Sequence, residues 1–357
     1  MKRATRSTGG RQSEELVACL ALVAALAAGC GQGGRSGDHG DDAGIDAGVD
    51  TGGDTVTLTG LPGNTMTLAP PGWGAAPGYH LAWAVQAGGA TEGEGPDDWA
   101  WSAAFAPNGD LFVVGAMYSI DVLFGAGTTN EISFNTLQEG GLYVARFDGA
   151  GVPVWVSTID VLHCEVADVV ALDDGSAVVV GSFDDYPSNP AVFGAGEPDE
   201  VVLDVSCDQC PFLAKYREDG AFEWVAYGDG DGDDDENGEG GWAWGIAQAT
   251  DGTYCVVGGY GELVVFDDGT PEGVTLTSDL ATFNRNGLAA RFGEDGLLLW
   301  ARSIRPQHQG TGSYFQAVVA LPDGSCAFSG YFMDTVHVDT GSGEPLSVAA
   351  NGNWSYL

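Results

Sequence analysis

Tyr143-Val-Ala-Arg-Phe147-Asp-Gly149-Ala-Gly-Val-Pro-Val-Trp155 is the stretch that decides the fold, because related stretches occur twice further along the chain. They run from Phe212-Leu-Ala-Lys-Tyr216 to Trp224 and from Leu288-Ala-Ala-Arg-Phe292 to Trp300. With Trp83 included, the tryptophans are spaced by 72, 69 and 76 residues. An Asn-Gly or Asp-Gly pair keeps the same period, with its glycines at Gly109, Gly175, Gly252 and Gly324. Such a fixed period indicates a repeat architecture.

Each period contains two hairpin signals. The Asn-Gly or Asp-Gly pair is followed by an apolar run, as in Phe112-Val-Val-Gly115 and Val256-Val-Gly258. This dipeptide between two β-forming runs is a strong hairpin signal. The Arg-Phe to Trp landmark has the same pattern of strand, tight turn and strand. The sequence therefore predicts an all-β protein with four antiparallel strands in each period.

A four-stranded unit repeated at a fixed period is typical of a β-propeller blade, whereas the strands of a β-sandwich do not recur with the same landmarks. The chain also resembles the SBBP family, the β-propeller repeats of bacterial extracellular proteins. The residues that carry the resemblance are Gly181-Ser-Phe183, Phe193-Gly194, Phe212-Leu-Ala-Lys-Tyr216, Asp219-Gly220 and Trp224. The resemblance covers residues 83–357; it implies blade structure and implies no catalytic residues.

The strand count bears on ring closure. After Pro96 the pattern gives three full blades and a fourth that stops within its third strand at Trp354-Ser-Tyr-Leu357. Residues 81–85 have the pattern of a fourth strand without a blade of its own. We expect a four-bladed ring in which residues 81–85 complete the last blade, because such closure removes exposed sheet edges. A larger propeller with further blades is the alternative.

The composition narrows the function classes. The chain has 57 glycines among 357 residues, which argues against a helical protein because glycine is costly inside helices. Lys and Arg number 12 against 51 Asp and Glu, for a formal net charge of −39. Nucleic acid is excluded as a partner, since its binding depends on cations that neutralise phosphates. The acidic surface is typical of a salty habitat or of a protein that recruits cations or basic partners.

The N-terminus predicts an export signal. A basic start is followed by the apolar run of residues 16–29, which is too short to span a bilayer. Leu26-Ala-Ala-Gly-Cys30 resembles a bacterial lipoprotein signal, which implies acylation at Cys30 and, with Gly31 next, an outer-membrane address. A secretory signal with an incidental Cys30 is the alternative. The expected organisation is a signal peptide over residues 1–29, a disordered Gly- and Asp-rich tether over 30–53, and a propeller over 54–357.

Short turns on one face of a propeller leave the longer connections on the other, where binding residues usually lie. These connections include residues 88–98, 118–140, 183–210, 228–241 and 259–286. One of them carries carboxylates at alternate positions, at Asp229, Asp231, Asp233 and Asp235. That spacing suits calcium, but Asp234 and Gly240 stand where a calcium-binding EF-hand loop needs glycine and glutamate. A solvated acidic loop is the competing interpretation, and no other cofactor is indicated.

Aromatic residues recur where each first strand begins: Trp99, Trp101, Trp242, Trp244 and Tyr314. Two interpretations are open for them. Repeating aromatics commonly pack between neighbouring blades, and the alternative is a platform on which a sugar or another ligand stacks.

The cysteines fit an oxidising compartment. Cys207-Asp-Gln-Cys210 predicts a local disulfide, with a metal half-site or a redox pair as alternatives. Cys255 and Cys326 fall on equivalent strands and are expected to be small core residues, and Cys164 has no obvious partner. Arg146, Lys215 and Arg291 occupy one repeat position, which favours a structural role for them.

No sequence fingerprint of a metalloprotease, serine hydrolase or nucleotide-binding enzyme occurs, and the five histidines are scattered singly. The sequence therefore favours a lipid-anchored binding or scaffold module, with a protein or glycan partner, over an enzyme. The alternative is a surface hydrolase of the glycosidase type, whose paired carboxylates would come from different blades.

Replacing Cys30 with Ser tests the anchor. The wild-type protein is expected in the membrane fraction and to resist salt washing, because several acyl chains hold a protein firmly where one holds marginally. Fractionation should find the variant released. A wild-type protein that is as soluble as the variant would contradict the anchor.

Overall fold

A computed structural model describes residues 20–23, 56–59, 65–68, 81–85, 87–90, 98–119, 121–126, 128–135, 141–161, 164–185, 190–203, 205, 207–229, 240–266, 273–278, 285–308, 311–350 and 355–356. The chain divides into two compact units, one of Met1–Val23 and Gly40–Ala84 and one of Ala24–His39 and Val85–Leu357. Within the described residues every element is a β-strand. The all-β prediction is confirmed for this part of the chain.

The first unit contains two small sheets. In one, β1 (Leu20–Val23) pairs with β4 (Leu81–Val85), and in the other β2 (Val56–Thr59) pairs with β3 (Thr65–Leu68). Residues 81–85 thus pair with β1 within this unit, and the expected closure of the last sheet by these residues stays a prediction. Both β1 and β4 are short apolar strands, and each satisfies backbone groups of the other. Cys30, the tether and the rest of the predicted signal peptide lie outside the described residues.

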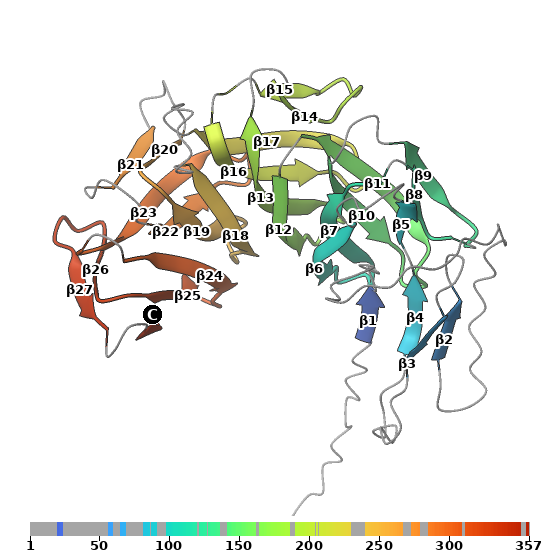
Figure 1. The fold of residues 1–357 in the computed structure, drawn as a ribbon, viewed down its shortest axis with the longest axis horizontal. Coiled ribbons are helices and arrows are strands. Elements are labelled where there is room, and N and C mark those ends of the chain that lie inside the picture. The colour runs from blue at the N-terminus through green and yellow to red at the C-terminus, as the bar shows by residue number, and fades with distance from the viewer. Residues whose placement is uncertain are drawn as a thin grey trace, which may run out of the picture. The chain divides into compact units, whose positions relative to one another are not determined.

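The second unit contains three six-stranded antiparallel sheets, which Figure 1 shows following one another in chain order. Sheet 1 has the order β6 (Trp99–Phe105), β7 (Leu111–Met117), β10 (Gly141–Phe147), β11 (Pro153–Asp160), β14 (Ala191–Phe193), β15 (Val201–Leu203). Sheet 2 has the order β12 (Cys164–Ala171), β13 (Ala177–Asp185), β16 (Cys207–Tyr216), β17 (Phe222–Asp229), β20 (Leu263–Phe266), β21 (Val274–Thr277). Sheet 3 has the order β18 (Gly241–Gln248), β19 (Tyr254–Tyr260), β22 (Asn286–Phe292), β23 (Leu298–Pro306), β26 (Thr335–Val338), β27 (Leu346–Ala349).

Two three-stranded sheets complete this unit. Sheet 4 has the order β24 (Ser313–Ala320), β25 (Cys326–Phe332), β28 (Ser355–Tyr356). The other has the order β5 (Ala87–Ala90), β8 (Asp121–Phe124), β9 (Ile132–Asn135). We number the repeats by their first strands, so that β6, β12, β18 and β24 begin repeats one to four.

The prediction of four strands per sheet is incomplete. The first four strands of sheets 1 to 3 come from one repeat, as predicted, but the last two are a hairpin that the next repeat inserts between its second and third strands. Ile159 of β11 pairs with Phe193 of β14, for example, and Gly228 of β17 pairs with Phe266 of β20. Residues 118–140, 183–210 and 259–286, expected to be loops, thus contain strands. The inserted hairpin covers a fourth-strand edge that would otherwise be exposed.

The repeat landmarks fix the register. In each of the three complete repeats the cation of the third strand lies directly opposite the tryptophan of the fourth: Arg146 with Trp155, Lys215 with Trp224 and Arg291 with Trp300. The Asp-Gly signals form three-residue loops, in which a turn is followed by a glycine with positive φ. In repeat two, Gly175 has a φ of 82° and its N–H donates to the Leu172 carbonyl at 3.1 Å. This loop is a common hairpin connection, and glycine adopts positive φ without strain.

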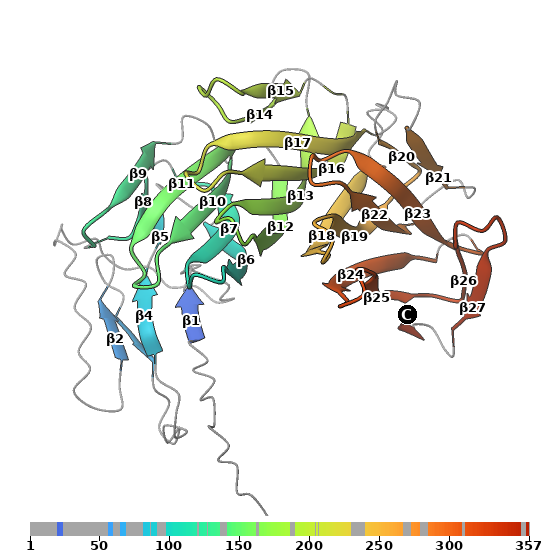
Figure 2. The same ribbon diagram turned by 180° about the vertical axis from the view of Figure 1, so that it is seen from behind.

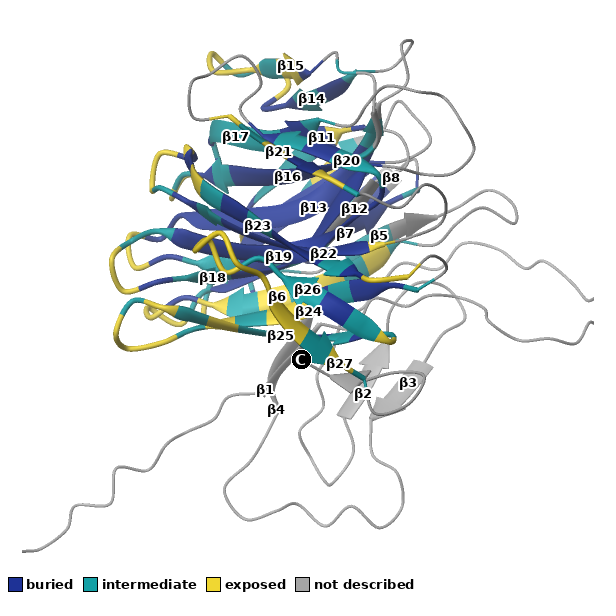
Figure 3. Cartoon of the chain, turned by 90° about the vertical axis from the view of Figure 1, so that its left-hand side faces the viewer, coloured by how far each residue is buried: buried dark blue, intermediate teal, exposed yellow. Residues whose placement is uncertain are grey.

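Burial explains why the central strands are apolar without alternation. Every residue of β7 and of β10 is buried, since both faces of sheet 1 are covered along these strands. Apolar clusters join sheet 1 to sheet 2, sheet 2 to sheet 3 and sheet 3 to sheet 4. The first strands lie next to one another, β6 against β12, β12 against β18 and β18 against β24, an order that Figure 2 also shows. Exposed residues concentrate at the turns, in β6 and in sheet 4 (Figure 3).

The repeated cation joins neighbouring repeats. Arg146 donates to Asp110 Oδ2 from Nε at 2.9 Å and from Nη2 at 2.6 Å, and its Nη1 donates to the Glu218 carbonyl of repeat two at 2.6 Å. Arg291 binds Asp251 of its own repeat and the Gly324 carbonyl of the next at 2.8 Å. The structural role predicted for this position is confirmed. These contacts also place both kinds of Asp-Gly turn on the same face, as expected.

The structure corrects the prediction for Cys255 and Cys326. They were expected to be separate core residues, but they form a disulfide between β19 and β25, with their Cα atoms 6.6 Å apart. Cys326 stands one residue earlier in its repeat than Cys255 does, so the two side chains leave opposite faces of their strands, and the packing of sheet 3 against sheet 4 brings them together. The bond is a covalent link from sheet 4 to the rest of the unit.

Removing the disulfide should loosen sheet 4. The double variant Cys255→Ala/Cys326→Ala is expected to lose about 2–5 kcal/mol of unfolding free energy, because a cross-link between distant residues restricts the unfolded chain. Urea denaturation measures the loss, and hydrogen exchange should accelerate in β24–β27 more than in β6–β11. Unchanged denaturation and exchange would show that the bond adds nothing.

Removing the Arg146 side chain should destabilise the protein by about 3 kcal/mol, because it leaves the poorly exposed Asp110 carboxylate without its cation. Arg217→Met is the matched control, since Arg217 pairs with Asp199 at the surface and such pairs contribute less than about 1 kcal/mol. Urea denaturation of Arg146→Met and Arg217→Met compares them. Equal losses would contradict the bridging role of Arg146.

Candidate functional site

Four aromatic rings and one arginine gather where repeat three meets repeat four. The ring centres of Trp242 and Trp244 on β18 lie 6.0 Å apart, and Trp244 lies 5.3 Å from Tyr314 on β24. Tyr314 lies 4.9 Å from Tyr331 on β25. We call these four residues with Arg285 the aromatic cluster. It lies at the strand ends opposite the Asp-Gly turns, on the face where sequence analysis expected binding residues.

A bulge in each first strand positions the rings. The register of β18 with β19 shifts between Ala243 and Gly245, and that of β24 with β25 shifts between Phe315 and Ala317. At this point the first strand presses on a glycine of the second: a Cβ on Gly258 would lie 1.8 Å from the Trp242 carbonyl oxygen, and one on Gly330 equally close to that of Tyr314. The repeat glycines are therefore required by close backbone approach.

Arg285 lies over this ring system. Its guanidinium carbon is 4.7 Å from the Trp242 ring centre and 5.7 Å from that of Tyr314, distances within the range of cation–π attraction. The Ser313 N–H donates to the Arg285 carbonyl at 2.9 Å, so the backbone of Arg285 is tied to the start of β24. The side chain is exposed, whereas Trp242 below it is only 6% exposed.

Buried polar contacts hold the strands beneath the cluster. The Tyr260 hydroxyl and Ser303 Oγ lie 2.6 Å apart, and Asn286 Nδ2 donates to the Gly261 carbonyl at 2.6 Å. Ser313 Oγ donates to the Ile304 carbonyl and accepts from the Gly287 N–H. Asn286 Oδ1 is buried without a hydrogen-bond partner among the described residues, while the bonds of Tyr260, Ser303 and Ser313 tie the strands beneath the rings to one another.

The charges that act on Tyr331 differ from those that act on three buried tyrosines elsewhere in the second unit. Burial raises the pKa of Tyr331, with a smaller raising effect of Tyr314 and a lowering effect of Arg285. Burial also raises the pKa values of Tyr143, Tyr216 and Tyr254, but there the charges that act are carboxylates: Asp98 for the first, Glu197 for the second, and Glu294, Asp174 and Glu223 for the third. A cation therefore acts on Tyr331, whereas carboxylates act on the other three tyrosines.

The predicted aromatic residues form two separate sets. Trp99 and Trp101 stack on each other at 5.9 Å on β6 and are 43% and 50% exposed, and no ring contact among the described residues joins them to Trp242, Trp244 or Tyr314. The contact of Trp244 with Tyr314 crosses from sheet 3 to sheet 4, so the expectation of packing between repeats is confirmed there. Both rings remain partly exposed.

Sequence analysis did not identify Arg285 and Tyr331. Arg285 was hidden in a stretch interpreted as a loop, although it is one of only 12 Lys and Arg residues in an acidic chain. Tyr331 follows the repeat glycine Gly330, a position that holds Ala116, Ser182 and Gly259 in the other repeats. An alignment of the repeats shows this difference, but the pattern alone does not place Tyr331 beside Tyr314.

The structure describes only some residues of the predicted calcium site and of the predicted Cys207–Cys210 disulfide. Asp229 ends β17, whereas Asp231, Asp233 and Asp235 lie outside the described residues, so the calcium site stays a prediction. Within the described part of the chain no three His, Cys, Asp or Glu side chains are grouped as metal ligands. Cys210 is disulfide-bonded, and because the side chain of Cys207 is not described, their pairing also stays a prediction.

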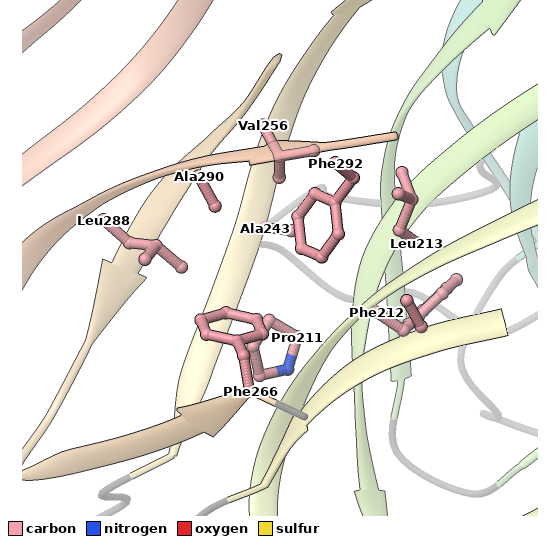
Figure 4. A pocket seen from close by; sticks show the side chains of 10 residues that line it. Pro211, Phe212, Leu213, Ala243, Val256, Phe266, Leu288, Ala290 and Phe292 are labelled. Carbon is pink, nitrogen blue, oxygen red and sulfur yellow. The ribbon is translucent and has the colours of Figure 1, made fainter. Parts of the chain in front are cut away.

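Two cavities of the second unit are features of packing. Figure 4 shows one of about 10 Å³ between sheets 2 and 3, lined by apolar side chains such as Leu213, Val256 and Phe292. This volume is at the limit for one water molecule, so the cavity is an imperfection of packing. The other, of about 350 Å³, lies beside Trp300. Trp155 and Trp224 occupy the position of Trp300 in the first two repeats, and each is covered by a turn glycine of the following repeat, Gly220 and Gly296. The cavity beside Trp300 therefore corresponds to a surface on which a neighbouring repeat packs.

No protein-family model matches the chain, and no match to a curated protein was found. No described segment forms a helix with the length and apolar character needed to cross a bilayer. The assignment of the site therefore rests on its geometry.

Proposed function

We propose that the chain is a lipid-anchored β-propeller of the bacterial cell envelope that binds polysaccharide through the aromatic cluster. The propeller is supported by four repeats in one strand order and by first strands that neighbour one another. In this proposal each sheet with its added hairpin is one blade. The anchor is supported by the basic start, the apolar run and Cys30 in the sequence.

The observation that carries the binding function is the run of partly exposed rings from Trp244 through Tyr314 to Tyr331. Sugar rings present apolar C–H faces that stack on aromatic side chains, while the tyrosine hydroxyls and Arg285 offer hydrogen bonds at the edges. The rings come from three strands of two sheets tied by the Cys255–Cys326 disulfide, so they are preorganised and little entropy is lost on binding.

Trp244→Ala tests this function. Binding to soluble polysaccharides, both neutral glucans and uronic acid polymers, should weaken about fivefold or more, because removal of one stacking ring costs on the order of 1–3 kcal/mol where nucleic-acid bases stack on aromatic side chains. Affinity electrophoresis measures the change for each polymer.

Trp101→Ala is the matched control, since Trp101 is also exposed and stacked on a neighbouring tryptophan but lies outside the cluster. It should leave binding unchanged. A loss as large as that of Trp244→Ala would move the binding surface away from the cluster, and failure of the wild-type protein to bind any polysaccharide tested would refute the proposed function.

A further inference from the structure

Arg285 stands apart from the other cations of the protein. Five of the described Lys and Arg side chains pair with carboxylates: Arg146, Lys215, Arg217, Arg291 and Arg302. Among the described residues no carboxylate pairs with Arg285, which contacts the rings of Trp242 and Tyr314 instead. This sets Arg285 apart from those five cations of the described part of the chain.

Stacking leaves the hydrogen-bonding capacity of Arg285 available. A guanidinium group carries five N–H donors in its plane and stacks through its face, so a stacked arginine keeps donors for a planar carboxylate. The rings hold the side chain in place at little further entropic cost. Arg285 is therefore a prepared anion-binding group at the edge of a sugar-stacking surface.

The local charge around the cluster supports this role despite the net charge of −39. The cation of Arg285 lowers the pKa of Tyr331, against the raising effects of burial and of Tyr314. Repulsion between exposed charges is largely screened beyond about 8–10 Å in physiological salt. An anion bound at Arg285 lies beside the rings of Trp242 and Tyr314.

We propose that the aromatic cluster selects polysaccharides whose sugar rings carry a carboxylate, with Arg285 binding the carboxylate while the sugar ring stacks on Trp244 and Tyr314. This inference rests on the proposed polysaccharide binding and adds the ligand class. A neutral sugar of the same shape would use the rings and gain nothing from the charge of Arg285.

Two oligomers of equal length separate the inference from the proposed function: an oligogalacturonate and the same oligomer with its carboxyl groups reduced to alcohols. Calorimetry in physiological salt, which screens the repulsion from distant acidic residues, should show at least tenfold tighter binding of the acidic oligomer, because hydrogen bonds to charged groups are stronger than neutral ones. Added salt should reduce this preference. EDTA in the buffer excludes metal-bridged binding.

Arg285→Gln should remove the preference, weakening the acidic oligomer about tenfold and leaving the reduced oligomer unchanged. Arg285→Lys should recover part of it, since lysine keeps the charge but loses the planar fork. Arg217→Gln, which removes an exposed cation in sheet 2, should change neither affinity, and thermal melting confirms that each variant is folded.

Equal wild-type affinity for the two oligomers, or an undiminished preference in Arg285→Gln, would overturn the selectivity and leave polysaccharide binding intact. Trp244→Ala should weaken both oligomers alike. Binding of neither oligomer by the wild-type protein would overturn the proposed function together with the inference.

Discussion

The second unit depends on an arginine that reaches out of its own sheet. Arg146 neutralises Asp110 in its own repeat and donates to the Glu218 carbonyl of the next, and Arg291 repeats this arrangement with Asp251 and Gly324. The central strands are apolar on both faces, so each sheet needs a neighbour, but apolar contact alone does not fix how two sheets align. The bridging cations set that alignment through directional bonds to the turns.

The need of each sheet for a neighbour that covers it also explains where the candidate site lies. In repeats two and three the turn between third and fourth strands covers the preceding tryptophan, as Gly220 covers Trp155 and Gly296 covers Trp224. Sheet 4 packs on sheet 3 with fewer described strands, and its faces are more exposed than those of β7 or β19. Rings at the start of β18 and β24 therefore remain accessible, while the disulfide and the buried serines hold the junction together.

Features that recur with the repeat period could be predicted from the sequence. The strands, the hairpins at the Asp-Gly pairs, the face shared by the short turns and the structural role of Arg146 all repeat and could be predicted. Contacts between repeats could not: a hairpin such as β14–β15 pairs with the preceding repeat, and Cys255 meets Cys326 only after two sheets have packed. Arg285 and Tyr331 could not be predicted either, because neither residue recurs at the equivalent position of the other repeats.

Departure from the repeat is itself the physical argument for function at this place. Positions with a structural role keep one residue type in each repeat, as the cation at Arg146, Lys215 and Arg291 and the glycine at Gly115, Gly258 and Gly330 do. The cluster breaks this rule: Tyr331 replaces a small residue, and Arg285 adds a charge that pairs with no carboxylate among the described residues. Neither residue is needed to cover a sheet or to satisfy a turn. Their stacking on partly exposed rings therefore favours recognition of a ligand over further stabilisation of the fold.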